Sequence, residues 1–324
     1  MTDRAPLPRP QPRPSGSRPN YALRRAVAAT LALLVLVVLG LGVRALVGAL
    51  GGESGSSDAA EARAVDQPTA TTEVPTTTTT APVVAEPRHN DLTAPPGFPL
   101  REPPVRAVSE AEPLVVWTLG DSSAQALGQL LENGLAGVPG VTTRTVHRNS
   151  TGLTRRDFYD WPAALPDLLA EGAPDVVVLS MGDNDAQPLQ PEGSETYVDV
   201  GDPAWLAEYE RRLTAFVGQL TAAGSRVYLV GQPAMRDPTF AARIAEVDRA
   251  YRAVAAADPE LTYISARALL GDDSGAYTAT LPGTGGARVT VRSDDGIHLS
   301  LEGARWLARV VGRQVLADYG IQGP

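Results

Sequence analysis

Three short stretches of the sequence carry side chains that can act together on an ester. They are "GDSS" at 120–123, "GDND" at 182–185 and "DGIH" at 295–298. A serine, a histidine and an acid are the groups needed for nucleophilic acyl transfer, in which the serine oxygen attacks a carbonyl carbon. His298 is one of only three histidines in the chain, and Asp295 lies three positions before it. One short turn can therefore carry both the acid and the base.

Each stretch also has a purely structural interpretation. Ser122 or Ser123 can cap a helix, and the residues 182–185 can form a polar turn. His298 can be a partly buried histidine that precedes a helix, and Ser300 is best explained as the cap of that helix. The three stretches together, in this order along the chain, favour a catalytic site over three unrelated turns.

Strands and helices alternate along the C-terminal two thirds of the chain. Apolar runs predict strands at 114–120, 141–147, 174–182, 226–233 and 261–266. Helical periodicity predicts helices at 123–135, 161–172, 204–224, 241–258 and 301–320. This alternation predicts a parallel sheet covered by helices on both faces, an α/β fold of three layers.

The predicted fold gives the polar stretches a common place. Sites in open α/β sheets lie beyond the carboxyl ends of the strands, where Ser122 and Asn184 fall. A serine at a helix N-terminus has backbone N–H groups and the helix dipole beside it, and both favour a developing anion. Asn184 can offer its side-chain NH2 group to the same anion.

With these stretches in place, the chain resembles the SGNH hydrolases, the superfamily that includes the GDSL lipases and esterases. The resemblance covers about 114–320 and rests on three blocks. The matching residues are Gly120, Asp121 and Ser122, then Gly182, Asn184 and Asp185, then Asp295 and His298. Gly152 in "RNSTGL" matches the glycine of a further block more loosely, and Ser123 stands where the family usually has leucine.

The resemblance implies a role for each site residue. Ser122 is the nucleophile, His298 takes and returns its proton, and Asp295 orients the imidazole ring. The backbone N–H groups of Ser122 and Gly152 and the side chain of Asn184 form the oxyanion hole. The family's fold is a mainly parallel, flavodoxin-like sheet between two layers of helices.

The N-terminal part of the chain predicts a membrane anchor. Residues 1–25 hold six arginines and one acid, and residues 26–50 are apolar except for Arg44. A basic flank before an apolar run of this length favours a single span with its N-terminus in the cytoplasm. A signal peptide cleaved near "ARA" at 62–64 and a buried core helix are the alternatives.

A linker and one catalytic domain follow the predicted anchor. Residues 51–110 are rich in Thr and Pro and have no apolar periodicity, which predicts a disordered tether outside the cytoplasm. Residues 111–324 form the predicted SGNH-like domain, in which the excursions 186–202 and 271–292 are expected to shape the pocket. His89 and His147 receive no role.

Composition narrows the chemistry further. The chain has no cysteine, and its 28 basic residues are all arginine, so disulfides, cysteine or lysine nucleophiles and Cys-ligated zinc are excluded. The net charge of −9 argues against nucleic acid as a partner. The sequence predicts no cofactor and no metal site.

These observations predict a membrane-anchored, extracytoplasmic serine esterase or deacetylase. Its substrate is an acylated small molecule or an O-acetylated envelope glycan. An O-acyltransferase with the same triad is the first alternative, since hydrolysis and transfer share an acyl-enzyme, and an envelope acyltransferase is then a candidate partner. A catalytically inactive glycan-binding or scaffold domain is the second alternative.

Overall fold

The computed structural model of the chain describes residues 97–323, which all lie within one compact unit. The predicted basic tail at 1–25 and anchor at 26–50 lie outside the described residues, as does the predicted linker up to residue 96, which includes His89. Within residues 97–323, no helix is both long and apolar enough to cross a membrane.

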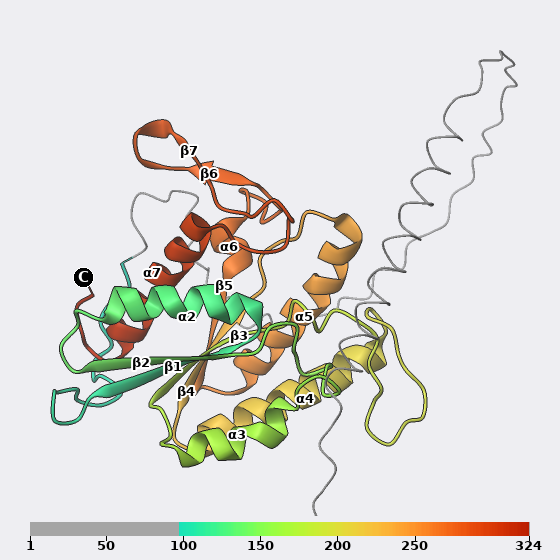
Figure 1. The fold of residues 1–324 in the computed structure, drawn as a ribbon, viewed down its shortest axis with the longest axis horizontal. Coiled ribbons are helices and arrows are strands. Elements are labelled where there is room, and N and C mark those ends of the chain that lie inside the picture. Colours follow the sequence, from blue (N-terminus) through green and yellow to red (C-terminus); the bar gives the residue numbers. More distant parts are fainter. Residues whose placement is uncertain (1–96, 324) are drawn as a thin grey trace, which may run out of the picture. The chain divides into compact units, whose positions relative to one another are not determined.

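A parallel sheet of five strands forms the centre of the fold, in the order β2-β1-β3-β4-β5 (Figure 1). The strands are β1 Leu114–Gly120, β2 Val141–His147, β3 Val176–Ser180, β4 Arg226–Gly231 and β5 Leu261–Ser265. The predicted α/β class with a mainly parallel sheet is confirmed. At the carboxyl end of β1, Gly120 lies opposite His147 on one side and Ser180 on the other.

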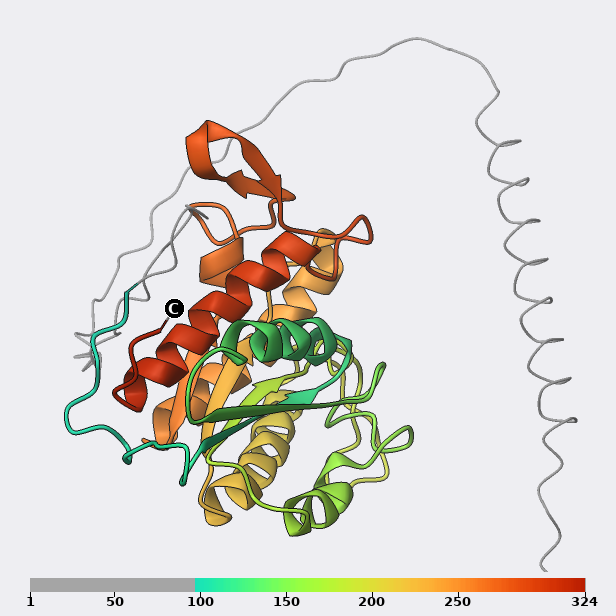
Figure 2. The ribbon, with the colours of Figure 1, turned by 60° about the vertical axis from the view of Figure 1, so that its left-hand side comes forward.

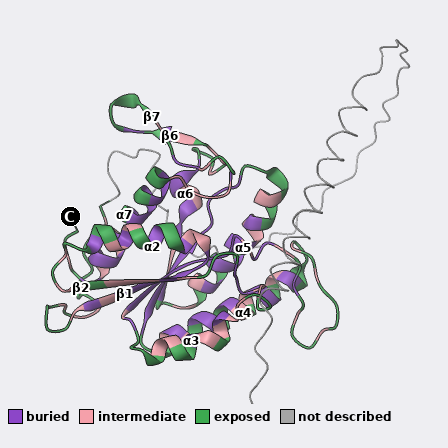
Figure 3. Cartoon of the chain, viewed as in Figure 1, coloured by how far each residue is buried: buried purple, intermediate pink, exposed green. Residues whose placement is uncertain are grey.

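Helices cover both faces of the sheet. They are α2 Ser122–Leu135, α3 Trp161–Ala170, α4 Pro203–Ala222, α5 Pro238–Ala257, α6 Ala266–Leu270 and α7 Leu301–Asp318. Alternate residues of a strand point to opposite faces. In β3, Val177 and Leu179 therefore pack with α3, α4 and α5, whereas Val176 and Val178 pack with α2, α6 and α7. Figure 3 shows most of the strands buried between these layers, with the edge strand β2 partly exposed.

The structure differs from the predicted elements mainly at strand ends and in one segment. Predicted strands 174–182 and 226–233 end early, at Ser180 and Gly231. The residues after each lie at the carboxyl edge of the sheet, where their backbone leaves the ladder. Residue patterns carried no signal for α6, for the hairpin of β6 Thr280–Pro282 and β7 Arg288–Thr290, or for the turn η1 Thr284–Gly286 between them. Figure 2 shows this hairpin extending from the body of the domain.

The described end of the predicted linker contacts the domain. Residues 97–110 form no helix or strand, yet the N–H of Arg101 donates to Ala317 at 2.9 Å and that of Val105 donates to Asp318 at 3.0 Å. The Arg106 guanidinium binds both carboxylate oxygens of Asp175 at 2.7 Å. The contacts of the folded domain thus begin upstream of the predicted boundary at residue 111.

Candidate active site

A tight turn between β1 and α2 presents Ser122. Gly120 has φ +151°, and a Cβ atom there would lie 1.8 Å from the Ser180 carbonyl oxygen, so no larger residue fits. The Asp121 carboxylate accepts the N–H of Ser123 at 2.9 Å and caps α2. The structural interpretation of Ser122 or Ser123 as the cap is therefore wrong. Ser122 is the first residue of the helix, and its hydroxyl is left for another partner.

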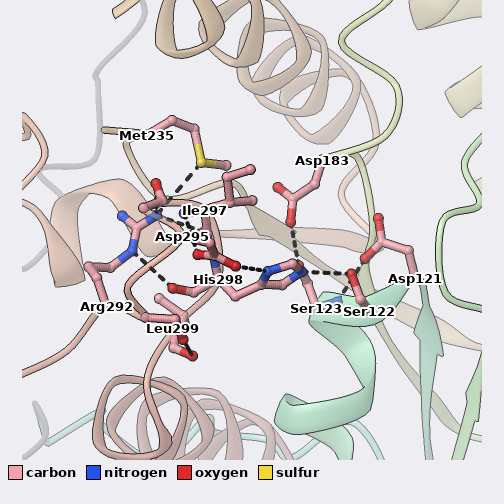
Figure 4. Close-up of polar contacts among 12 residues, drawn as sticks. Asp121, Ser122, Ser123, Asp183, Met235, Arg292, Asp295, Ile297, His298 and Leu299 are labelled. Atoms are coloured by element: carbon pink, nitrogen blue, oxygen red, sulfur yellow. Dashed lines mark hydrogen bonds and ion pairs between the residues drawn. The ribbon is translucent and has the colours of Figure 1, made fainter. Parts of the chain in front are cut away.

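That partner is His298, which comes from the loop before α7. The Ser122 Oγ and His298 Nε2 atoms lie 3.0 Å apart, and His298 Nδ1 lies 2.7 Å from Asp295 Oδ2 (Figure 4). Both distances are those of hydrogen bonds and lie within the reach of a general base. The structure thus brings together three predicted site residues that span 176 positions of sequence.

The turn that carries Asp295 and His298 is held by its own acid. Asp295 Oδ1 accepts the N–H groups of Ile297 at 2.8 Å and His298 at 3.0 Å. Partial burial raises the pKa of Asp295, but the hydrogen bonds from the His298 ring and these two N–H groups lower it to about 2. Asp295 is consequently a carboxylate at neutral pH. Ser300 caps α7 through the N–H of Gly303, as predicted.

Asn184 and Gly182 are bound to the same carboxylate oxygen. Asp121 Oδ2 accepts the Gly182 N–H at 3.1 Å and one Asn184 Nδ2 hydrogen at 3.2 Å. The second Asn184 amide hydrogen has no partner among residues 97–323. Because Asp121 also caps α2, it fixes Asn184 relative to the helix that begins with Ser122.

Asp185 connects this strand end with the loop that contains Gly152. Its buried carboxylate accepts the Thr154 N–H at 2.7 Å, the Thr154 hydroxyl at 2.8 Å and the Tyr209 hydroxyl at 2.8 Å. A Cβ atom on Gly152 would lie 2.2 Å from Asp185 Oδ1, so this close approach requires glycine. Burial raises the pKa of Asp185, and the hydrogen bonds oppose that rise. Asp185 therefore positions the Gly152 loop.

Sequence reasoning missed the environment of Asp183. The Ser123 hydroxyl donates to Asp183 Oδ2 at 2.6 Å, while Asp183 Oδ1 is buried and has no partner among the described residues. Burial raises the pKa of Asp183, and the hydrogen bond from the Ser123 hydroxyl opposes that rise. The stretch 182–185 predicted a polar turn or a site, but nothing in it shows that Asp183 faces Ser123.

Arg292 was missed as well. Its side chain is only 2% exposed and lies beneath the turn that carries His298. The guanidinium donates to the carbonyl oxygens of Ala234 and Ile297, the latter at 2.7 Å, and lies 4.9 Å from the centre of the Tyr277 ring. It joins the turn that carries His298 to the loop after β4. A single arginine after an apolar run carries no sequence signal for this role.

Two recesses meet at Ser122. A cavity of about 50 Å³ lies between the start of α2 and the start of α7, and its apolar lining includes Leu127, Val230, Ile297, Leu299 and Leu307. An open groove of about 490 Å³ lies on the other side of α2, toward β2. Ser122 and Ala126 line both. Neither recess is lined by residues 186–202 or 271–292, so the prediction that those excursions shape the pocket is wrong for these two.

Several solved structures are similar to the domain at low identity. The acetyl xylan esterase AlAXEase is 19% identical, with 62% of this chain and 99% of that one covered and a TM-score of 0.45. A variant of Axe2, an acetyl xylan esterase from Geobacillus stearothermophilus, is 16% identical, with 66% and 97% covered and a TM-score of 0.45. A GDSL-like lipase from Bacteroides thetaiotaomicron VPI-5482 is 13% identical, with 65% and 91% covered and a TM-score of 0.44.

No curated protein matches the chain. One family model does match, over residues 115–314, which begins inside β1 and ends inside α7. This stretch is more than half of the chain and contains Ser122, Asn184, Asp295 and His298. The chain therefore belongs to the family described as "Protein of unknown function (DUF459)".

Proposed function

We propose that the domain is a serine esterase that hydrolyses an acyl ester through a covalent acyl-enzyme. The observation that carries the proposal is the continuous hydrogen-bonded series from Ser122 through His298 to Asp295, located at the N-terminus of α2. A nucleophile within reach of a base, with that base oriented by a third group, is the arrangement that nucleophilic acyl transfer requires.

The steps follow from the positions of these groups. His298 Nε2 accepts the Ser122 proton while Oγ bonds to the carbonyl carbon of the ester, and the carbonyl electrons move onto oxygen. His298 then gives the proton to the leaving alcohol, and the acyl group remains on Ser122. Water next attacks the acyl-enzyme with His298 again as base, releasing the carboxylic acid. Asp295 remains ionised throughout and stabilises the imidazolium.

We assign the developing oxyanion to the backbone N–H groups of Ser122 and Gly152 and the free amide hydrogen of Asn184. The first N–H groups of a helix have no partner within the helix, which leaves that of Ser122 available. Asp121 and Asp185 fix the other two donors in advance of the reaction. Each such donor typically contributes about 3 kcal/mol of transition-state stabilisation.

The size of the cavity beside Ser122 supports a short acyl group. A cavity needs about 10–15 Å³ to hold one water, so the cavity of about 50 Å³ has room for a few waters or a short acyl chain. Its lining is mainly aliphatic, which suits a methyl group. We therefore place an O-acetyl ester first among the substrates.

We also propose that the substrate lies outside the cytoplasm. An extracytoplasmic domain on a membrane anchor and a Thr/Pro-rich tether would act on envelope glycans. The basic residues 1–25 before the apolar residues 26–50 support this topology. A reporter enzyme fused after residue 60 should be active only outside the cytoplasm, and cytoplasmic activity of that fusion would rule the topology out.

Covalent labelling tests the chemistry without knowledge of the natural substrate. The full-length protein should react with a fluorophosphonate at Ser122 and should hydrolyse 4-nitrophenyl acetate. Ser122→Ala should lose both activities, whereas Ser274→Ala, at an exposed serine in the loop after α6, should lose neither. Ester hydrolysis by Ser122→Ala at the wild-type rate would show that the proposed nucleophile is wrong.

A further inference from the structure

The groove between α2 and β2 is the larger of the two recesses described at Ser122, and the proposed mechanism leaves it without a role. It measures about 490 Å³, within the range of small-molecule sites. Its lining residues are almost all polar: Ser122, Gln125, Ala126, Gln129, Glu132, Thr145 and His147. On the α2 side of the groove, successive turns of the helix each contribute a polar side chain.

The base of the groove is fixed by close packing between helix and strand. A Cβ atom on Gly128 would lie 2.3 Å from Thr145 Oγ1, so α2 approaches β2 closely only because glycine stands there. The Thr145 hydroxyl donates to Glu132 Oε1 at 2.6 Å across the same contact. The groove is therefore shaped before any ligand arrives.

The walls of the groove offer hydrogen-bonding groups that the protein does not use. The Gln129 amide and the His147 ring have no hydrogen-bond partner among residues 97–323. Gln125 uses its carbonyl oxygen to accept Asn149 Nδ2 at 3.3 Å, and its own amide hydrogens have no such partner. An amide offers both donors and an acceptor, and so does a neutral imidazole. Hydroxyl groups, which both donate and accept, match this mixture.

The charge of the lining narrows the class of ligand. Among the described residues, Glu132 is the one charged side chain that lines the groove, and no arginine does. Arg144 belongs to β2, but its guanidinium lies 4.7 Å from the centre of the Trp117 ring and pairs with Glu171 at 2.7 Å, on the opposite face of the sheet. A carboxylate without a basic partner repels phosphate and carboxylate groups. The lining therefore favours a neutral ligand.

We propose that this groove binds the carbohydrate part of the ester, a neutral, hydroxyl-rich sugar chain, while the small cavity on the α7 side takes the acyl group. The two recesses share Ser122 and Ala126, so an ester bond held at Ser122 has one recess on each side. This inference rests on the proposed esterase function and names its substrate class. It also gives His147 a role, as a binding residue outside the triad.

The kinetic test compares two esters in the full-length protein. O-acetylated xylotetraose carries a neutral sugar chain, whereas 4-nitrophenyl acetate carries no sugar. In the double variant Gln129→Ala/His147→Ala, the ratio of kcat/KM for the first ester to that for the second should fall at least tenfold, mainly through KM. Asn133→Ala, one turn further along α2 and outside the groove, should leave both values unchanged. A ratio in the double variant within twofold of wild type would overturn the inference.

A charge comparison and a binding measurement separate this inference from the proposed function. Wild type should turn over O-acetylated xylotetraose at least tenfold better than O-acetylated oligogalacturonate, which carries carboxylates. Equal rates for the two esters would overturn the neutral class of ligand.

Full-length Ser122→Ala should bind unacetylated xylotetraose in titration calorimetry, and adding Gln129→Ala/His147→Ala should abolish that binding. If wild type hydrolyses no ester but this binding pattern holds, the esterase proposal fails and the sugar site stands. If Ser122→Ala binds no tetraose, the sugar site is wrong.

Discussion

Ser123 donates its hydroxyl to the buried carboxylate of Asp183 at 2.6 Å, directly beside the bond between Ser122 and His298. The two adjacent serines thus have separate partners. Ser122 faces the imidazole, whereas Ser123 satisfies one oxygen of an acid whose other oxygen is buried without a partner among the described residues. The hydroxyl of Ser123 is therefore part of the support of the site.

Ser123→Ala should separate stability from nucleophilicity. The change leaves Asp183 without its only side-chain hydrogen bond among the described residues, and an unpaired buried group costs about 1–3 kcal/mol. The midpoint of thermal unfolding should fall by roughly 2–4 °C per kcal/mol for a domain of this size. Most ester hydrolysis and the fluorophosphonate label on Ser122 should remain. If Ser123→Ala abolished labelling at the wild-type midpoint, Ser123 would be the nucleophile.

The triad should lose activity as a unit. Ser122→Ala and His298→Ala should each lower kcat for 4-nitrophenyl acetate by several orders of magnitude, and the double variant should lose little more. The reason is that the hydroxyl cannot be deprotonated without the base, and the base has nothing to deprotonate without the hydroxyl. Losses that multiply in the double variant would show that the two residues act independently.

The ionised Asp295 side chain should stabilise the folded protein, and this contribution should be lost in acid. Its pKa in the folded protein, about 2, is below the value of about 3.9 for an unpaired Asp, so folding favours the ionised form. The stabilisation is present above about pH 4 and is lost as pH falls through about 2. The unfolding midpoint of Asp295→Asn should therefore approach that of wild type between pH 4 and pH 2. Asp294→Asn, at the exposed neighbouring position, is the matched control, and a gap that widened toward pH 2 would contradict the assignment.

Arg292→Lys should reduce kcat while the substrate still binds. A lysine cannot hold the Ala234 and Ile297 carbonyl oxygens together as the planar guanidinium does, so the turn that carries His298 should shift. A displacement of about 1 Å can cost on the order of 100-fold in rate. Steady-state kinetics with 4-nitrophenyl acetate should show the loss in kcat with KM within about twofold. Arg288→Lys, in the exposed hairpin, should leave both unchanged, and wild-type kcat in Arg292→Lys would exclude the positioning role.

Ile297→Ala should change the preferred length of the acyl group. The Ile297 side chain lines the cavity of about 50 Å³ beside Ser122, and its removal enlarges the space for the acyl chain. The ratio of kcat/KM for 4-nitrophenyl butyrate to that for the acetate should rise severalfold relative to wild type. Leu301→Ala, at an exposed position at the start of α7 outside the cavity lining, should leave the ratio unchanged. An unchanged ratio in Ile297→Ala would place the acyl group elsewhere.

The sequence predicted the sheet well because buried parallel strands are continuous apolar runs. "LVVWTLG" at 114–120 reads as such a run, and its bounds agree with β1. The hairpin of β6 and β7 was missed because its strands have three residues each and lie among glycines, so no periodicity can develop. Local patterns indicate an element only where it is long enough to repeat.

The reacting residues of the candidate site were predictable from the three short stretches that carry them, whereas the contacts that support those residues were predictable only within one turn. Asp295 and His298 lie three positions apart, so a single turn indicates their contact. Arg292 and Ala234 lie 58 positions apart, and their contact depends on how the loop after β4 packs on the loop before α7. The contact of Ser123 with Asp183, 60 positions apart, likewise follows from strand order. Sequence patterns therefore predict the proposed reacting residues more readily than the residues that position them through long-range contacts.

The contacts of residues 101–106 place the chain's entry into the domain far from Ser122. Arg101 and Val105 bind the last turn of α7, whereas the His298 loop leads into its first turn. With a rise of about 1.5 Å per residue, the 18 residues of α7 separate these two ends by about 27 Å. The chain thus enters the described domain at the end of α7 that lies away from the His298 loop and Ser122.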